Sequence, residues 1–179
     1  MRKSVYLVAL FVILVLLTAG CNKTAKVEYT PESPVTTEQV NTGSQYVARA
    51  FVESLYTDNR DLFVKCYPDG LPDKMGEASG VDVFDSLKKT AHSGETYTGT
   101  ASVSSREYSA EFGFDLVAKK REISSVTGIG YSDIDQVVVE KVLVTHANTE
   151  GTVANCLYFV VYRTGETWYL FDSCSEGNF

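Results

Sequence analysis

The sequence predicts an α+β fold in which N-terminal helices pack on a curved antiparallel sheet. Apolar residues recur at helical spacing through the first half of the chain, around Val47, Phe51 and Leu55. β-Branched and aromatic residues dominate the second half, where turn residues separate the apolar runs. Helices followed by an antiparallel meander are typical of α+β domains, in which helices cover one face of a sheet.

Residues 1–20 have the pattern of a signal peptide. Arg2 and Lys3 give the chain a positive start, and an apolar run follows from Tyr6 to Leu17. A membrane-spanning helix needs about 20 apolar residues. Polar residues begin again at Asn22, so the run is too short to span and is predicted to be cleaved.

The end of this run resembles the lipobox of bacterial lipoproteins. It reads Leu17-Thr18-Ala19-Gly20-Cys21. The resemblance implies cleavage after Gly20 and attachment of a diacylglycerol to the sulfur of Cys21. Two acyl chains anchor a protein stably, whereas one chain binds a membrane only marginally. The implied partner is therefore the cell membrane, reached through lipid on Cys21, with the protein on its extracytoplasmic face.

Charge and composition describe the rest of the chain. The formal net charge is −7, and it becomes −9 when Arg2 and Lys3 are removed. Such an acidic chain is a poor ligand for nucleic acid. After Cys21, the segment to residue 42 is rich in Thr and Glu and carries two prolines, so it is predicted to be a flexible tether. Residues 43–179 have the length of a single domain.

Three helices are predicted at the start of this domain. The first covers residues 46–56, and Asp58-Asn59 ends it and caps the second, which carries Leu62, Phe63 and Cys66 inward. Two prolines predict a loop over residues 68–73. The third helix begins near Val81 and ends near residue 91, with Asp82 and two lysines placed to suit its dipole.

Strand signals follow. Residues 96–108 and 134–145 are predicted strands, and residues 116–124 are assigned to a helix between them. A turn at residues 148–151 leads into a hairpin of residues 154–162 and 167–171. The hairpin is predicted to turn at Thr164-Gly165.

The domain is similar to the cone-shaped nuclear-transport-factor-two-like fold of many small envelope lipoproteins. The similarity lies in the helix at residues 46–56, the turn at 57–59 and the closing segment at 165–170. It implies a cone whose pocket holds a small ligand, a catalytic site or nothing. No catalytic Asp or His of enzymes with this fold matches a position here, so the resemblance implies a fold and extends to function only by analogy.

Three cysteines remain once Cys21 carries lipid. Cys66 lies on the apolar face of a helix and is predicted to be a core residue. Cys156 and Cys174 are a candidate disulfide, because such bonds persist outside the cytoplasm. A turn at Thr164-Gly165 places Cys156 opposite Ser173 and turns Cys174 to the other face, whereas a shift of one residue pairs the two cysteines.

Signals for catalysis are weak. His92 and His146 lack the spacing of metal ligands, and no metal or other cofactor is predicted. Asp133 and Asp135 are predicted to mark a polar turn that enters the strand, and the alternative is that both face a pocket from a strand edge. Aromatic residues crowd the final hairpin and are predicted to be sheet core and cross-strand pairs, with the lining of a ligand pocket as the alternative. These pocket candidates are Tyr158, Tyr162 and Trp168.

Three classes of function stay open. The preferred one is a non-enzymatic, lipid-anchored binding protein for a small molecule or an envelope protein. The second is a small enzyme that uses a carboxylate within the cone, with Asp133 and Asp135 as first candidates. The third is an inhibitor or immunity-type lipoprotein that recognises a secreted protein.

Overall fold

The computed structural model describes residues 30–91, 96–148 and 151–174 of the chain. The signal peptide, Gly20, Cys21 and His92 lie outside these residues. The helices are α2 (Ser44–Tyr56), α3 (Arg60–Lys65), α4 (Leu71–Ser79), α5 (Val83–Ala91) and α6 (Leu116–Thr127), with short 3-10 turns η1 (Val40–Thr42), η2 (Ala110–Phe112) and η3 (Tyr131–Asp133). The strands are β1 (Thr96–Glu107), β2 (Gln136–Asn148), β3 (Gly151–Thr164) and β4 (Thr167–Cys174). Among the described residues, every helix is too short or too polar to cross a bilayer.

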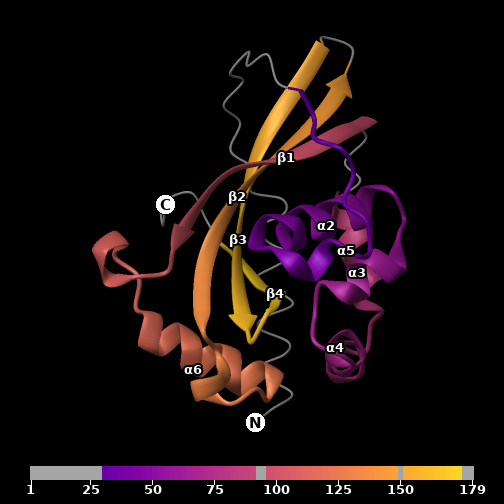
Figure 1. The fold of residues 1–179 in the computed structure, drawn as a ribbon. Coiled ribbons are helices and arrows are strands. Elements are labelled where there is room, and N and C mark those ends of the chain that lie inside the picture. The colour runs from indigo at the N-terminus through magenta and orange to yellow at the C-terminus, as the bar shows by residue number, and fades with distance from the viewer. Residues whose placement is uncertain (1–29, 92–95, 149–150, 175–179) are drawn as a thin grey trace.

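The strands form one antiparallel sheet in the order β1-β2-β3-β4, which confirms the α+β class (Figure 1). Two register shifts interrupt β1, at Thr98 and at Val103. A third shift falls in β4, where Phe171 is the extra residue between Leu170 and Asp172. Bulges of this kind increase the bend and twist of a strand. The long strands β1 and β2 are visibly bent (Figure 1).

Helices cover both faces of the sheet. Helix α2 packs on one face, against inward residues of β2 that include Val138, Val142 and Val144, and α3 to α5 lie on the same side, with α3 and α5 against α2 and α4 against α5. Helix α6 packs on the other face, where Ile123 and Val126 meet residues such as Val137. The prediction of N-terminal helices on one face is confirmed, and α6 adds a cover to the opposite face that the sequence had not placed. The two-residue alternation of β2 divides its side chains between these two layers.

The predicted helices and strands are present, and several bounds differ. Strand β2 ends at Asn148, β3 begins at Gly151 and β4 ends at Cys174, each three residues beyond the predicted range. Helix α4 begins inside the segment 68–73, where the two prolines predict a loop, because Pro72 lies in its first turn, where a missing N–H costs little. The final hairpin turns at Gly165-Glu166, one residue later than predicted, since Thr164 pairs with Thr167. Helix α6 extends three residues beyond the predicted end.

The last part of the predicted tether packs against the domain. Val35 and Val40 are buried in the core cluster under the helices. The backbone N–H of Glu32 donates to the carbonyl of Thr100 at 3.1 Å, so the segment adds polar contacts to the free edge of β1. The domain therefore includes residues 30–42, where composition predicts a tether.

Candidate functional site: an acidic hollow on the helical layer

Helices α3, α4 and α5 surround a hollow of about 470 Å³ on the surface of the helical layer. Its apolar lining comes from Phe63, Val64, Pro72, Val83 and Phe84, and its charged lining from Arg60, Asp73, Glu77 and Asp82. Val64 is 42% exposed, and Val81 beside the hollow is 46% exposed. Concave surfaces of this volume with apolar walls and a few polar groups are the usual form of a ligand site.

The sequence builds this hollow through short helices and their caps. Asn59 accepts a hydrogen bond from the N–H of Leu62 and so starts α3. Asp82 accepts one from the N–H of Asp85 at 2.9 Å in the first turn of α5. Pro72 starts α4 between them. The hollow is lined by α3, by residues 72–77 of α4 and by residues 82–84 at the start of α5.

Arg60 is the cation that lines the hollow, and it forms ion pairs with two aspartates. Its guanidinium donates to Asp82 at 2.7 Å and to Asp85 at 3.2 Å. It also lies 4.8 Å from the centre of the Phe84 ring, within the range of a cation–π contact. The hydrogen bond to Arg60 lowers the pKa of Asp82, and the same bond raises the pKa of Arg60. This group of charges is therefore internally compensated.

Asp73 and Glu77 are different, because neither forms an ion pair among the described residues. They lie one turn apart on α4, and both are exposed on the rim of the hollow. Like charges at this spacing repel and destabilise a helix slightly. Asp73 in the first turn is offset by the helix dipole, whereas Glu77 lies beyond that turn, and Lys74, three residues before it, forms no ion pair with it. A cation bound between them would relieve the repulsion.

A second hollow, of about 430 Å³, lies on α6 and is lined by Arg121, Ser124, Ser125 and Tyr131. Its charged group is a guanidinium, and no carboxylate lines it. The charged residues that line the two hollows therefore give them opposite net charge, negative on the helical layer and positive on α6. The helical hollow suits a cation, and the hollow on α6 does not.

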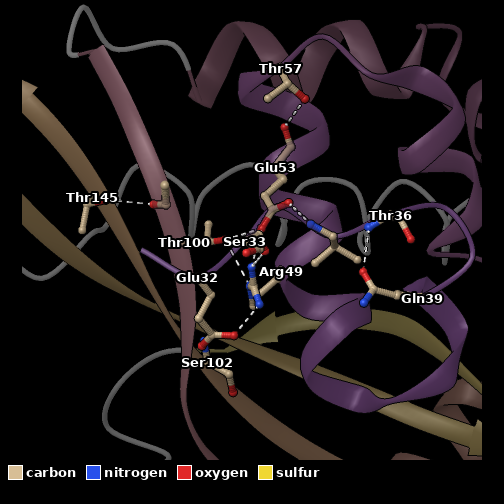
Figure 2. A network of polar contacts seen from close by, with 12 residues as sticks. Glu32, Ser33, Thr36, Gln39, Arg49, Glu53, Thr57, Thr100, Ser102 and Thr145 are labelled. Carbon is tan, nitrogen blue, oxygen red and sulfur yellow. Dashed lines mark hydrogen bonds and ion pairs between the residues drawn. The ribbon is translucent and has the colours of Figure 1, made fainter. Parts of the chain in front are cut away.

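A buried polar network beneath the helices has a structural role (Figure 2). Arg49 is 2% exposed and donates to Glu32, to the carbonyl of Ser33, to Glu53 and to Thr100. Glu53 in turn accepts from Thr100 and, at 2.7 Å, from the N–H of Val35. Each charged group of the pair has several partners, as buried charges require. The network joins residues 32–35 to α2 and β1 and leaves little capacity for a ligand.

Glu140 is the one described carboxylate that is fully buried without a partner. It is 0% exposed on β2, between Val138 and Val142 on the face toward α2, and neither oxygen accepts a hydrogen bond from a described residue. Burial raises the pKa of Glu140, and hydroxyls of three serines partly oppose the rise without reaching hydrogen-bonding geometry. These serines are Ser44, Ser102 and Ser105. Buried polar groups without partners are rare and often mark functional positions or bound water.

The structure does not bring the pocket candidates from the sequence together. Tyr158 and Tyr162 are buried on the face covered by α6, whereas Trp168 packs on the face of α2 to α5. Asp133 and Asp135 are exposed, in η3 and just before β2. The N–H of Asp135 donates to the carbonyl of Arg163, which makes this segment a polar turn into the strand. The aromatic residues are sheet core.

The cysteines and His146 lie in or beside the packed core of the domain. Cys66 is buried, as predicted, and burial raises its thiol pKa. Cys156 and Cys174 are both free thiols, so the candidate disulfide is absent from the structure. The ring of His146 is buried, and its centre lies 5.1 Å from the centre of the Tyr56 ring. The described residues contain no group of three metal-binding side chains.

Sequence reasoning missed both the hollow and Glu140. The hollow depends on α4, and the prolines at 68 and 72 predict a loop where this helix begins. Glu140 had a signal, because it is a charged residue at an inward position of the β-branched run at residues 137–144. No known family model matches the chain, and comparison with curated proteins and with solved structures finds no significant similarity.

Proposed function

We propose that this protein is a lipid-anchored, extracytoplasmic lipoprotein whose domain binds a cationic ligand with an apolar body. The single observation that carries the proposal is the hollow between α3, α4 and α5, where apolar walls meet the unpaired carboxylates of Asp73 and Glu77. Apolar walls favour burial of a hydrocarbon body. Unpaired carboxylates select for a positive charge.

The affinity of a minimal ligand can be estimated. A benzyl group that buries about 100 Å² of apolar surface contributes about 2.5 kcal/mol. An ammonium group beside two exposed carboxylates adds about 1 kcal/mol. Together these give about 3.5 kcal/mol before the loss of translational and rotational freedom on binding is subtracted, so the Kd is expected to be about 3 mM or weaker. A natural ligand with more apolar surface would bind more tightly.

Benzylamine and benzyl alcohol are suitable probes, because they share a ring and differ in charge. Amide chemical shifts of the isotope-labelled mature protein are followed during titration with each probe. Benzylamine is expected to shift residues 60–65 and 71–84, with benzyl alcohol bound about fivefold more weakly at the same place. Shifts confined to the hollow on α6, or equal affinity for both probes, would contradict the proposal.

The location belongs to the same proposal and is supported by the sequence 17–21. Lipid on Cys21 would hold the protein on the membrane, while residues 22–29 connect the anchor to the segment that starts at Thr30. A cationic ligand could be a small organic amine or a basic side chain of a secreted protein. The second source is the form that an inhibitor or immunity-type lipoprotein would take.

The cone-shaped, nuclear-transport-factor-two-like fold is also proposed. The bent antiparallel sheet with α2 to α5 on one face supports it. Superposing an experimental structure of this domain on structures with that fold would test the proposal. A strand order different from that of the fold would contradict it.

An enzyme remains the second candidate function, and Glu140 favours it. A buried carboxylate with a raised pKa is a common form of general acid. Glu140 therefore replaces Asp133 and Asp135 as the first catalytic candidate. Activity on a panel of ester, amide and glycoside substrates that disappears in Glu140→Gln, with folding intact, would support this function over binding alone.

A further inference from the structure

The extra residue in β4 changes which side of the sheet Cys174 faces. Val161 pairs with Leu170, and this register, if continued, would place Cys174 opposite Leu157 on the face of α2 to α5. Instead the bulge at Phe171 shifts the pairing by one residue, so that Cys174 lies opposite Tyr158. Cys174 is thereby turned to the face that α6 covers.

Cys156 lies on the same face, two residues along β3 from Tyr158. Both cysteines pack against the cluster of Phe114, Val139 and Tyr158. They are partly exposed and free. They are diagonal neighbours on adjacent strands, a relation with Cα atoms about 7–8 Å apart. Disulfides need about 4.4–6.8 Å, so a movement of about 1 Å is required, and Cys174 is the terminal residue of β4.

We propose that Cys156 and Cys174 form an oxidisable pair that a small disulfide converts into a bond across β3 and β4. The Cys156 thiolate attacks one sulfur of the small disulfide, and the first small thiolate leaves and takes a proton. The Cys174 sulfur, after losing its proton, attacks the Cys156 sulfur and releases the second small thiol. Two protein thiols and one small disulfide thus give one protein disulfide and two small thiols.

The two thiols have different roles because their surroundings differ. Burial, reinforced by the negative charge of Asp172, raises the pKa of Cys174 to about 12. A thiol held in its protonated form attacks slowly. Cys156 is therefore the first thiol to react, and attack by Cys174 is the slow step. The pair is separate from the acidic hollow, and its oxidation does not depend on ligand binding.

The test uses the mature chain with Cys21→Ser, oxidised glutathione and intact-mass measurement with peptide mapping. The expected product has lost two hydrogens, with residues 156 and 174 in one linked peptide. Cys174→Ser is expected to keep one glutathione on Cys156, and Cys156→Ser is expected to react at least tenfold more slowly. Cys66 is expected to stay reduced because it is buried.

Asp172→Asn tests the division of roles, because it removes the neighbouring negative charge while keeping the side-chain shape. It is expected to speed closure of the bond severalfold without changing the rate at which Cys156 first takes up glutathione, which the Cys174→Ser background measures. A wild-type product that retains glutathione on either cysteine without a linked peptide would overturn the proposal. A linked peptide that contains Cys66 would do the same.

Discussion

Glu140 is a single residue whose burial makes stability depend on pH. Its folded-state pKa is raised, so the folded protein holds this proton more tightly than the unfolded chain does. Stability contributed by the protonated form is full below the ordinary glutamate pKa and is lost as the pH rises toward the raised value. At neutral pH the group is a cost to the fold.

Glu140→Gln removes this titration. The variant is expected to be more stable than the wild type at neutral pH by about 1 kcal/mol, since a neutral amide is less costly to bury than a charge. The difference should shrink as the pH falls to about 4. Urea unfolding at a series of pH values measures it, with the exposed Glu111→Gln as a control. A constant difference across the series would show that Glu140 keeps an ordinary pKa.

Arg49 stabilises the fold, whereas ionised Glu140 destabilises it, because the buried guanidinium of Arg49 has hydrogen-bond partners. Arg49→Met leaves Glu53 buried without its cation and is expected to cost about 3–5 kcal/mol in the free energy of unfolding. The matched control is Lys88→Met, which breaks an exposed pair with Asp58 and should cost less than about 1 kcal/mol. Equal losses in the two variants would mean that the buried network contributes no more than a surface pair.

At the scale of elements, the contact between residues 30–35 and β1 depends on Gly99. Its φ is 153°, and a Cβ there would lie 2.4 Å from the Cβ of Pro31. Gly99→Ala is therefore expected to release this segment and speed amide exchange at Glu32 and Ser102. Gly80→Ala is the control, since its φ is also positive but nothing lies within 4 Å of the added Cβ. It should lower stability by about 1–2 kcal/mol without changing exchange at those amides.

The elements that sequence predicted well are those with a strong period. Helix α2 has regular apolar spacing, and β2 to β4 are rich in β-branched and aromatic residues between turn residues, so the sequence predicts these elements. Helix α4 was not predicted, because a proline is common both in loops and in the first turn of a helix, and the sequence around Pro72 does not distinguish the two. The bulge at Phe171 was equally hidden, since one extra residue in a strand leaves no mark on composition.

The candidate site was less predictable than the fold for a physical reason. Its walls come from α3, α4 and α5, and their relative placement depends on packing rather than on any local pattern. Asp73 and Glu77 look like ordinary solvated charges in the sequence. Only the tertiary structure reveals that Arg60 pairs with Asp82 and Asp85, while Asp73 and Glu77 form no ion pair among the described residues.

At the scale of the whole molecule, the proposed lipid anchor determines where the hollow operates. Cys21→Ala removes the sulfur that would carry the diacylglycerol. The expected product is an uncut precursor that incorporates no labelled fatty acid and leaves the membrane fraction only if its signal peptide is lost by another route. Gel mobility and lipid labelling in the expressing cell measure this. A lipid-labelled product of mature size would refute the anchor.

Charge recognition by the hollow is the central claim, and the affinity of benzylamine tests it most directly. Asp73→Asn/Glu77→Gln is compared with Glu111→Gln/Glu166→Gln, which changes the net charge equally at exposed sites elsewhere. The first variant is expected to bind benzylamine about fivefold more weakly than the wild type, and the second to bind it unchanged. Equal affinity in all three proteins would contradict a cation site in the hollow.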